Sequence, residues 1–205
     1  MMERTTKFLL LALCIAIVTN PTIAKKTKYK NKPDYRRLQL LKRKFKGFYL
    51  KKEFQKASQM SNKLNSLAGK VYGNNHPILS FYYTYTGRAY YGARKYRSAV
   101  TLFHKSLQIN QANRRRSSSY YARDYSNLGN VYFHLKKYKK SILFFQKALQ
   151  LRIRSRGKYH NSVATLYSNL GSVYEAAGNK KKALEYYEKS LSVELYNFKR
   201  LTEDN

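Results

Sequence analysis

Histidine is the side chain that most often supplies acid–base or metal chemistry near neutral pH, and this chain has four, His76, His104, His134 and His160. None stands four residues from another with a carboxylate between them, the spacing of a helical metal-ligand pair. The serine, cysteine and glycine patterns of nucleophilic and phosphate-binding sites are absent, and no carboxylate pair stands out among ten acidic residues. We therefore predict a protein that is not an enzyme and uses no metal or cofactor.

Most of the charged side chains in the sequence are lysines and arginines. The 205 residues include 42 Lys and Arg against 10 Asp and Glu, a formal net charge of +32. Residues 25–174 hold 34 of these basic residues and only three acidic ones, whereas residues 175–205 hold six of each sign. An excess of one sign destabilises a compact chain by self-repulsion. The imbalance therefore predicts an anionic partner that neutralises it.

The first 24 residues differ in kind from the rest. Two basic residues precede an eleven-residue apolar run, Phe8 to Val18, and small residues follow up to Ala24. This order is typical of a secretory signal peptide cleaved after Ala24, and it predicts a secreted or periplasmic protein. Two alternatives stay open. An uncleaved N-terminus would anchor the chain in a membrane, although a spanning helix needs about 20 apolar residues, and Cys14 would be the lipidated residue of a lipoprotein.

A repeat with a period of 42 residues runs through the rest of the chain. Gly87, Gly129 and Gly171 keep this spacing, and a degenerate copy precedes them in which Phe45 replaces the glycine. The other positions in phase are Tyr83, Tyr125 and Tyr167; Tyr90, Tyr132 and Tyr174; Ala99, Ser141 and Ala183; and Phe103, Phe145 and Tyr187. A fixed period of this length predicts stacked repeats, that is, a solenoid.

The spacing inside each copy predicts two helices. Tyr125, Gly129 and Tyr132 step by four and three, which places them on one face of an α-helix, and a second helix with the same steps follows. Glycine costs a helix on the order of 1 kcal/mol relative to alanine, so we expect each repeated glycine to mark the contact between the two helices of a pair. Turns within the pairs are expected at 93–95, 135–137 and 177–179.

The start of each first helix also has a signature. Pro77, Ser119 and Asn161 share one phase, and each suits a helix N-terminus as first-turn proline or N-cap. His76 and His160 share the preceding phase, and we expect a turn or helix-start role for them. The tyrosines of the repeat are expected inside the protein.

The order Tyr, Leu-Gly, Tyr, Ser, Phe, Ala in residues 125–148 resembles the tetratricopeptide repeat, and the 42-residue period is similar to the variant found in kinesin light chains and many bacterial proteins. The resemblance covers about residues 76–196 and extends weakly to about 36. It implies an all-α solenoid of stacked antiparallel helix pairs, with three clear units and a degenerate N-terminal one. The chain then divides into a signal peptide (1–24), a basic arm (25–35), the degenerate repeat (36–75), the repeat domain (76–199, in units 76–117, 118–159 and 160–199) and a tail (200–205).

The same resemblance implies a concave groove, lined by the first helix of each pair, that binds a peptide or another protein. Asparagines there can bond an extended peptide backbone because a carboxamide both donates and accepts, and arginines can hold a carboxylate bidentately. Phe81 and Thr84 are expected on this face as well. The partner-binding residues expected in the groove are Arg88, Tyr91, Arg123, Asn127, Asn130, Phe133, Asn169 and Ser172. In the alternative interpretation the asparagines bridge helices and the arginines are only solvated.

The repeat phase also sorts the basic residues onto two edges. A first ridge follows the turns within pairs: Arg94, Lys95, Arg97, Lys136, Lys137, Lys139 and Lys140. A second ridge follows the connections between pairs: Arg114, Arg115, Arg116, Arg156 and Lys158. The alternative interpretation is that these charges form an ordinary solvated surface.

These observations favour an exported interaction scaffold that binds another protein or a peptide, acidic or extended, in its groove. The alternative is a basic adaptor that attaches through its ridges to anionic lipid, lipopolysaccharide, a wall polymer or nucleic acid. Nucleic acid is the least favoured of these partners, because the sequence contains no nucleic-acid-binding motif beside its basic residues. A third hypothesis is self-association through the C-terminal end, where we expect apolar surface around Leu184, Leu191 and Leu195 to stay open.

Overall fold

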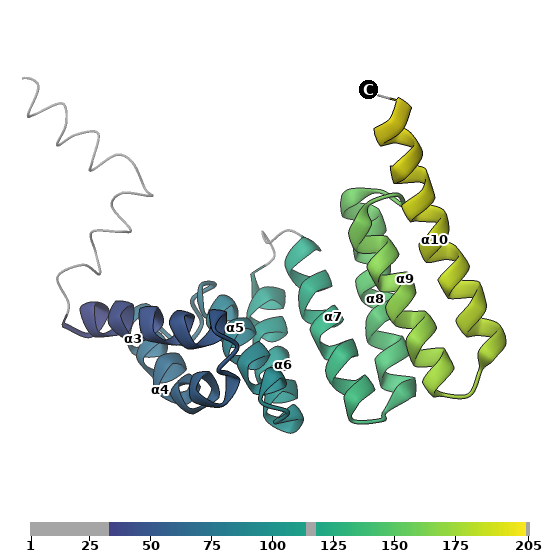
Figure 1. Ribbon diagram of the computed structural model, residues 1–205. Helices are drawn as coiled ribbons and strands as arrows, with labels where there is room; N and C mark the ends of the chain where they lie inside the picture. The colour runs from purple at the N-terminus through teal and green to yellow at the C-terminus, as the bar shows by residue number, and fades with distance from the viewer. Residues whose placement is uncertain (1–32, 114–117, 204–205) are drawn as a thin grey trace, which may run out of the picture.

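The computed structural model describes residues 33–113 and 118–203, which form eight helices and no strand (Figure 1). The helices are α3 (Pro33–Leu50), α4 (Phe54–Tyr72), α5 (Leu79–Gly92), α6 (Tyr96–Ala112), α7 (Ser118–His134), α8 (Tyr138–Arg156), α9 (Asn161–Ala176) and α10 (Lys180–Glu203). The predicted signal peptide, residues 25–32 of the basic arm and Arg114 to Arg116 lie outside the described residues. Among the helices described, none combines the length and apolar character that crossing a membrane requires.

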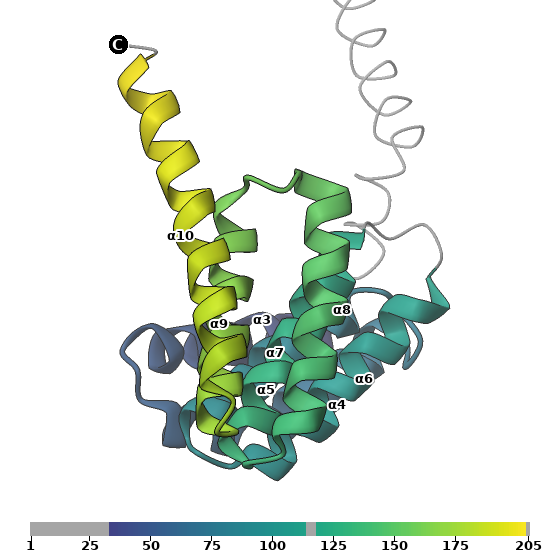
Figure 2. The same ribbon diagram turned by 90° about the vertical axis from the view of Figure 1, so that its right-hand side faces the viewer.

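Helices that follow one another in sequence pack against one another, and this builds a solenoid. The row runs from α3 and α4 at one end to α9 and α10 at the other (Figures 1 and 2). The turns within the pairs fall at 93–95, 135–137 and 177–179, as the sequence predicts. The predicted all-α solenoid of helix pairs is therefore confirmed.

A glycine against an aromatic ring fixes the distance between the helices of each pair. A Cβ atom added to Gly129 would lie 2.7 Å from the ring of Phe145. The equivalent distances are 2.7 Å from Gly87 to Phe103 and 2.6 Å from Gly171 to Tyr187. Atoms cannot approach so closely, so a larger residue would push the helices apart. The predicted role of these glycines is thus confirmed.

The small residue opposite the glycine contributes a polar link in the middle unit. Ser141 on α8 is buried, and its Oγ donates a hydrogen bond of 2.8 Å to the carbonyl oxygen of Gly129. Serine therefore stands where the other units have Ala99 and Ala183 without leaving its hydroxyl unpaired.

The turns within pairs share one backbone geometry. Their central residue has a positive φ in every unit: 59° at Lys52, 57° at Arg94, 55° at Lys136 and 83° at Gly178. In the middle unit, the amide of Lys136 donates to the carbonyl of Phe133 and that of Lys137 to Tyr132, which closes the helix end. Left-handed backbone costs a residue other than glycine about 1–2 kcal/mol. In three units the residue with positive φ is nevertheless a lysine or an arginine.

A histidine lies just before the start of two of the first helices. His160 is the N-cap of α9, and its Nδ1 accepts a 3.1 Å hydrogen bond from the amide of Ser162. His76 Nδ1 accepts likewise from the amide of Ile78 at 3.2 Å. The expected turn or helix-start role is confirmed for both: His160 caps α9, and His76 lies in the turn before α5, whose N-cap is Ile78. The expectation that Asn161 caps α9 is wrong, because Asn161 is already the first residue of the helix.

Replacing Gly129 by alanine tests the contact that spaces the pairs. We expect Gly129→Ala to lower the free energy of unfolding by about 1–3 kcal/mol, because the new methyl group overlaps the Phe145 ring. Denaturant unfolding followed by circular dichroism measures this. Phe145→Leu should recover part of the loss in the Gly129→Ala background.

Gly47 is the matched control, because it also lies inside a helix but nothing stands within 4 Å of its added Cβ. Gly47→Ala should raise stability by up to about 1 kcal/mol. Equal effects at the two glycines would contradict this interpretation.

Candidate functional site

Four of the predicted groove residues meet in one cavity. Arg88 and Tyr91 on α5 and Asn127 and Asn130 on α7 line a cavity of about 320 Å³. The other lining residues are Tyr49, Phe54, Gly92 and Phe103. The cavity lies mainly among the first helices α3, α5 and α7, and Phe54 reaches it because Gly92 leaves room for its ring. We call this cavity, together with Arg123 one helical turn before Asn127, the groove site.

An aromatic ring supports the first cation of the groove site. The guanidinium of Arg88 lies 5.6 Å from the ring centre of Tyr49, a cation–π contact between α5 and α3. Burial raises the pKa of the Tyr49 hydroxyl, and the charge of Arg88 opposes that rise. Tyr49 is therefore a neutral platform, which leaves the charge of Arg88 to an outside ligand.

Arg123 presents an unused hydrogen-bonding edge. Its guanidinium lies 5.4 Å from the ring centres of both Phe81 and Tyr120. Its Nε and Nη2 atoms, which share one edge of the guanidinium plane, are buried and have no hydrogen-bond partner among the described residues. The same holds for Nδ2 of Asn127, one turn along α7. All three atoms are donors, so the group that would satisfy them is an acceptor such as a carboxylate.

Further positive charge surrounds Arg123. Arg152 on α8 donates from Nη1 to the Ser119 hydroxyl oxygen at 2.8 Å. The pKa of Arg152 is lowered, first by burial and then by the charges of Arg156 and Arg123. Cations that lower one another's pKa repel each other, so an anion placed among them is bound favourably. This cluster joins the groove site to the second ridge through Arg156.

A buried carboxylate next to Arg123 holds the first helices together. Asp124 on α7 is fully buried, and it accepts hydrogen bonds from Thr84 on α5 at 3.1 Å and from Asn110 on α6 at 2.6 Å. The Ser106 hydroxyl lies 3.0 Å from the same carboxylate. Burial raises the pKa of Asp124, and this outweighs Arg123 and the hydrogen bonds, which lower it. The prediction that Thr84 faces the groove is wrong, because this network keeps Thr84 inside.

The sequence itself indicates this network, because an aspartate stands at a repeat position that is buried in both neighbouring units. Asp124 occupies the phase of Tyr82 and Leu166, which are both buried and mainly apolar. A carboxylate at a core phase must find polar partners in its own unit and the one before it. Its position beside Arg123 sets where that arginine leaves α7.

The other predicted groove residues lie outside the cavity. Phe133 packs against Tyr138 with their ring centres 6.2 Å apart. The hydroxyl of Ser172 on α9 bonds the carbonyl of Ser168 at 3.2 Å, and Asn169 beside it is half-buried. The site therefore concentrates on α3, α5 and α7, while α9 adds no residue to the cavity.

The first ridge is exposed, and one of its lysines, Lys140, lies near a tyrosine ring. The ammonium of Lys140 is 5.5 Å from the ring centre of Tyr132, and Lys182 repeats the contact with Tyr174 at 5.3 Å, one period later. Across residues 33–113 and 118–203 a single ion pair forms, between Lys56 and Glu53. Aromatic faces thus take the place that carboxylates usually have beside surface lysines.

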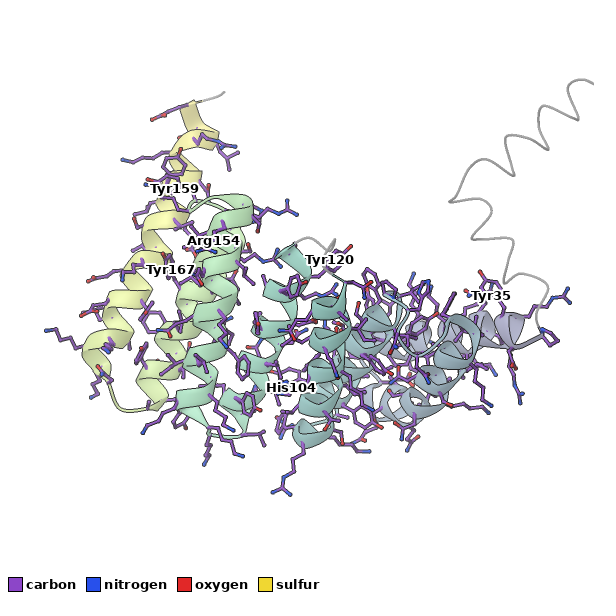
Figure 3. All side chains as sticks on the ribbon, turned by 180° about the vertical axis from the view of Figure 1, so that it is seen from behind. Tyr35, His104, Tyr120, Arg154, Tyr159 and Tyr167 are labelled. Carbon is purple, nitrogen blue, oxygen red and sulfur yellow. The ribbon has the colours of Figure 1, made fainter. Side chains whose placement is uncertain are left out.

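The described part of the second ridge lies around the connection from α8 to α9. Arg156 and Lys158 line a shallow cavity of about 410 Å³ to which α10 adds Arg200. Tyr159 stacks on Tyr196 of α10 with ring centres 3.6 Å apart, at the edge where Figure 3 labels Tyr159. Arg200 was not among the predicted ridge residues, although it lies one period after Lys158 and two periods after Arg116.

Comparison with known proteins supports the fold. Residues 120–193 match the family model of the tetratricopeptide repeat. No curated protein matches the chain.

Three solved structures share the architecture. BtubC (BKLC) from P. vanneervenii is 18% identical with a TM-score of 0.71, and the match covers 82% of this chain and 66% of that one, just under two thirds of its length. The nearly identical TPR-like repeats of a kinesin light chain from Podosopora anserina are 18% identical with a TM-score of 0.67, covering 81% and 78%. MamA is 20% identical with a TM-score of 0.61, covering 85% and 86%. At these identities the likeness concerns the fold alone.

The raised pKa of Asp124 gives stability an unusual pH dependence. A carboxyl whose folded pKa is raised stabilises the fold below its unfolded pKa and loses that contribution as pH rises through the folded value. We therefore expect the free energy of unfolding of the native chain, measured relative to Asp124→Asn, to increase as the pH falls from neutral toward the usual pKa range of a carboxyl group. Denaturant titrations of both proteins across this range give the difference, in which the other titrating groups cancel. A difference that shrinks on acidification would contradict the raised pKa.

Proposed function

We propose that this chain, whose residues 120–193 match the tetratricopeptide repeat and whose helices form a solenoid, is an interaction scaffold whose groove site holds an acidic, extended segment of another protein. Repeats of this family bind other proteins or peptides. The observation that carries the proposal is the set of three buried donors, on Arg123 and Asn127, that have no acceptor within the described chain.

The chemistry of these donors favours a carboxylate. Nε and Nη2 of one arginine can bond the two oxygens of a carboxylate side by side, and a planar pair of this kind is among the stronger hydrogen-bonded contacts in proteins. The rings of Phe81 and Tyr120 already hold the guanidinium, so little side-chain freedom is lost on binding. Arg88 offers a second cation in the neighbouring cavity.

The spacing along α7 favours an extended chain. Arg123 and Asn127 are one helical turn apart, about 6 Å, which is close to the rise of two residues in an extended peptide. An acidic side chain on Arg123 therefore leaves the following backbone within reach of Asn127 and Asn130. A carboxamide can then bond that backbone without reading its side chains.

Replacing Arg123 by lysine tests the bidentate contact. Lysine keeps the charge but cannot present two donors on one edge, so Arg123→Lys should weaken binding by about tenfold or more. The probe is a fluorescein-labelled peptide in which glutamate alternates with serine, and fluorescence anisotropy measures its dissociation constant. Asn127→Ala should weaken binding of the same peptide.

Arg97→Lys is the matched control, since it makes the same chemical change on the exposed first ridge. It should leave the dissociation constant nearly unchanged. The proposal fails if Arg97→Lys weakens binding as much as Arg123→Lys, or if a peptide with glutamine in place of glutamate binds equally well.

The cavity around Arg156, Lys158 and Arg200 favours a second candidate, a basic adaptor that binds a polyanionic surface. For such binding the logarithm of affinity should fall steeply and linearly with that of salt. Vesicles of phosphatidylglycerol and phosphatidylcholine, compared in a sedimentation assay, test it. Binding that survives Arg123→Lys and is abolished by replacing Arg156, Lys158 and Arg200 with glutamine would show that the second ridge, and not the groove site, is the binding surface.

Export is the third element of the proposal. It rests on residues 1–24, whose order of basic, apolar and small residues is that of a cleaved signal. Amino-terminal sequencing of the protein recovered from the producing cell should begin at Lys25. A chain that retains Met1 and stays with the cytoplasmic fraction would remove export and leave the groove site untouched.

A further inference from the structure

Exposed apolar side chains recur along one side of the last helix. Leu184, Leu191, Leu195 and Phe198 of α10 are 61%, 54%, 51% and 65% exposed. They step by seven, four and three residues, which places them along one side of the helix. We call these four residues the α10 stripe. It includes the three leucines for which the sequence predicts open apolar surface.

The α10 stripe is built to receive another helix. One period earlier, Leu184 and Leu191 correspond to Ile142 and Leu149 of α8. Those residues pack into a core cluster with Leu166, Leu170 and Val173 of α9, the first helix of the next pair. On α10 the corresponding side chains are exposed, and among the described helices α10 packs mainly against α9.

We propose that the α10 stripe packs against α10 of a second copy of this chain, in an antiparallel pair of helices. This inference goes beyond the proposed function, because it concerns the end of the solenoid rather than the groove site. A two-fold arrangement uses the same surface on both copies and closes after two chains. It leaves the groove site of each copy free.

The distribution of charge favours a second copy as the occupant. Residues 25–174 carry 34 basic and three acidic side chains, so two copies repel each other along most of their length. Helix α10 carries six basic and four acidic residues, which makes it nearly balanced. Two copies therefore approach with the least repulsion along α10.

The shape of this end favours the antiparallel direction. The last turns of α10 extend past the ends of α8 and α9 (Figures 1 and 2). A second α10 that runs the opposite way lies along this projecting part. Its own basic body then sits at the opposite end of the helix pair, away from the body of the first copy.

Added salt should strengthen the association of two copies, whereas it should weaken the binding of an acidic partner. Screening weakens repulsion between the two positive bodies, whereas the apolar contact between stripes is not weakened. The dimer dissociation constant should therefore fall as salt rises. Binding of an acidic peptide at the groove site should weaken under the same change.

Light scattering of the purified full-length chain over a range of concentrations tests the proposal. The native chain should approach twice its monomer mass as concentration rises and grow no further. Leu191→Glu combined with Leu195→Glu should raise the dissociation constant about tenfold or more, because the new charges would be buried between the helices. Leu195→Lys alone should act in the same direction.

Leu143→Glu is the matched control. Leu143 on α8 is 47% exposed and lies off the α10 stripe, so the same chemical change there should leave the dissociation constant unaltered. Circular dichroism checks that each variant is folded. The proposal is overturned if the native chain stays monomeric at the highest concentration, if Leu143→Glu dissociates the pair as strongly, or if the mass grows beyond two chains.

Discussion

The contact of a glycine with an aromatic ring sets the geometry on which the rest of this protein depends. Gly87, Gly129 and Gly171 allow Phe103, Phe145 and Tyr187 to lie almost against the backbone of the first helix. Each pair therefore has the same spacing, and equal pairs stack in a regular row. Because the row is regular, residues that share a phase share a side of the molecule. Binding surfaces then extend over several units instead of being confined to one.

The groove site arises where neighbouring units differ at one shared phase. Phe81 on α5 and Arg123 on α7 occupy equivalent positions, and the ring of the first supports the guanidinium of the second. Asp124 links α7 to α5 through Thr84 and to α6 through Asn110, and its burial fixes the turn of α7 that carries Arg123. Elsewhere, tyrosine rings partner lysines in a chain with few carboxylates. A rigid core network and a set of aromatic platforms thus hold a surplus of cations in defined places.

The sequence predicts those features that every unit repeats. The period located the turns, the glycine contacts and four residues of one cavity, because each depends only on phase. It could not predict features that belong to one unit. Thr84 was assigned to the groove by phase, but the carboxylate of Asp124, at a phase where other units have Tyr82 and Leu166, draws it inside. Tyr120 was missed for a similar reason, since it meets Arg123 together with Phe81 of the neighbouring unit. Arg200 could have been predicted, because it shares the phase of Arg116 and Lys158.

The left-handed turns place the stability of the fold and the charge of the first ridge in opposition. Lys52, Arg94 and Lys136 adopt a backbone conformation that glycine takes at no steric cost. At Arg94 and Lys136, which belong to the first ridge, an exchange for glycine would relieve the backbone and remove a positive charge from that ridge. The last unit already has glycine there, at Gly178, and it is also the unit whose overall charge is balanced. Selection of this protein for heat resistance alone would therefore favour glycine at these turns and reduce the positive charge of the first ridge.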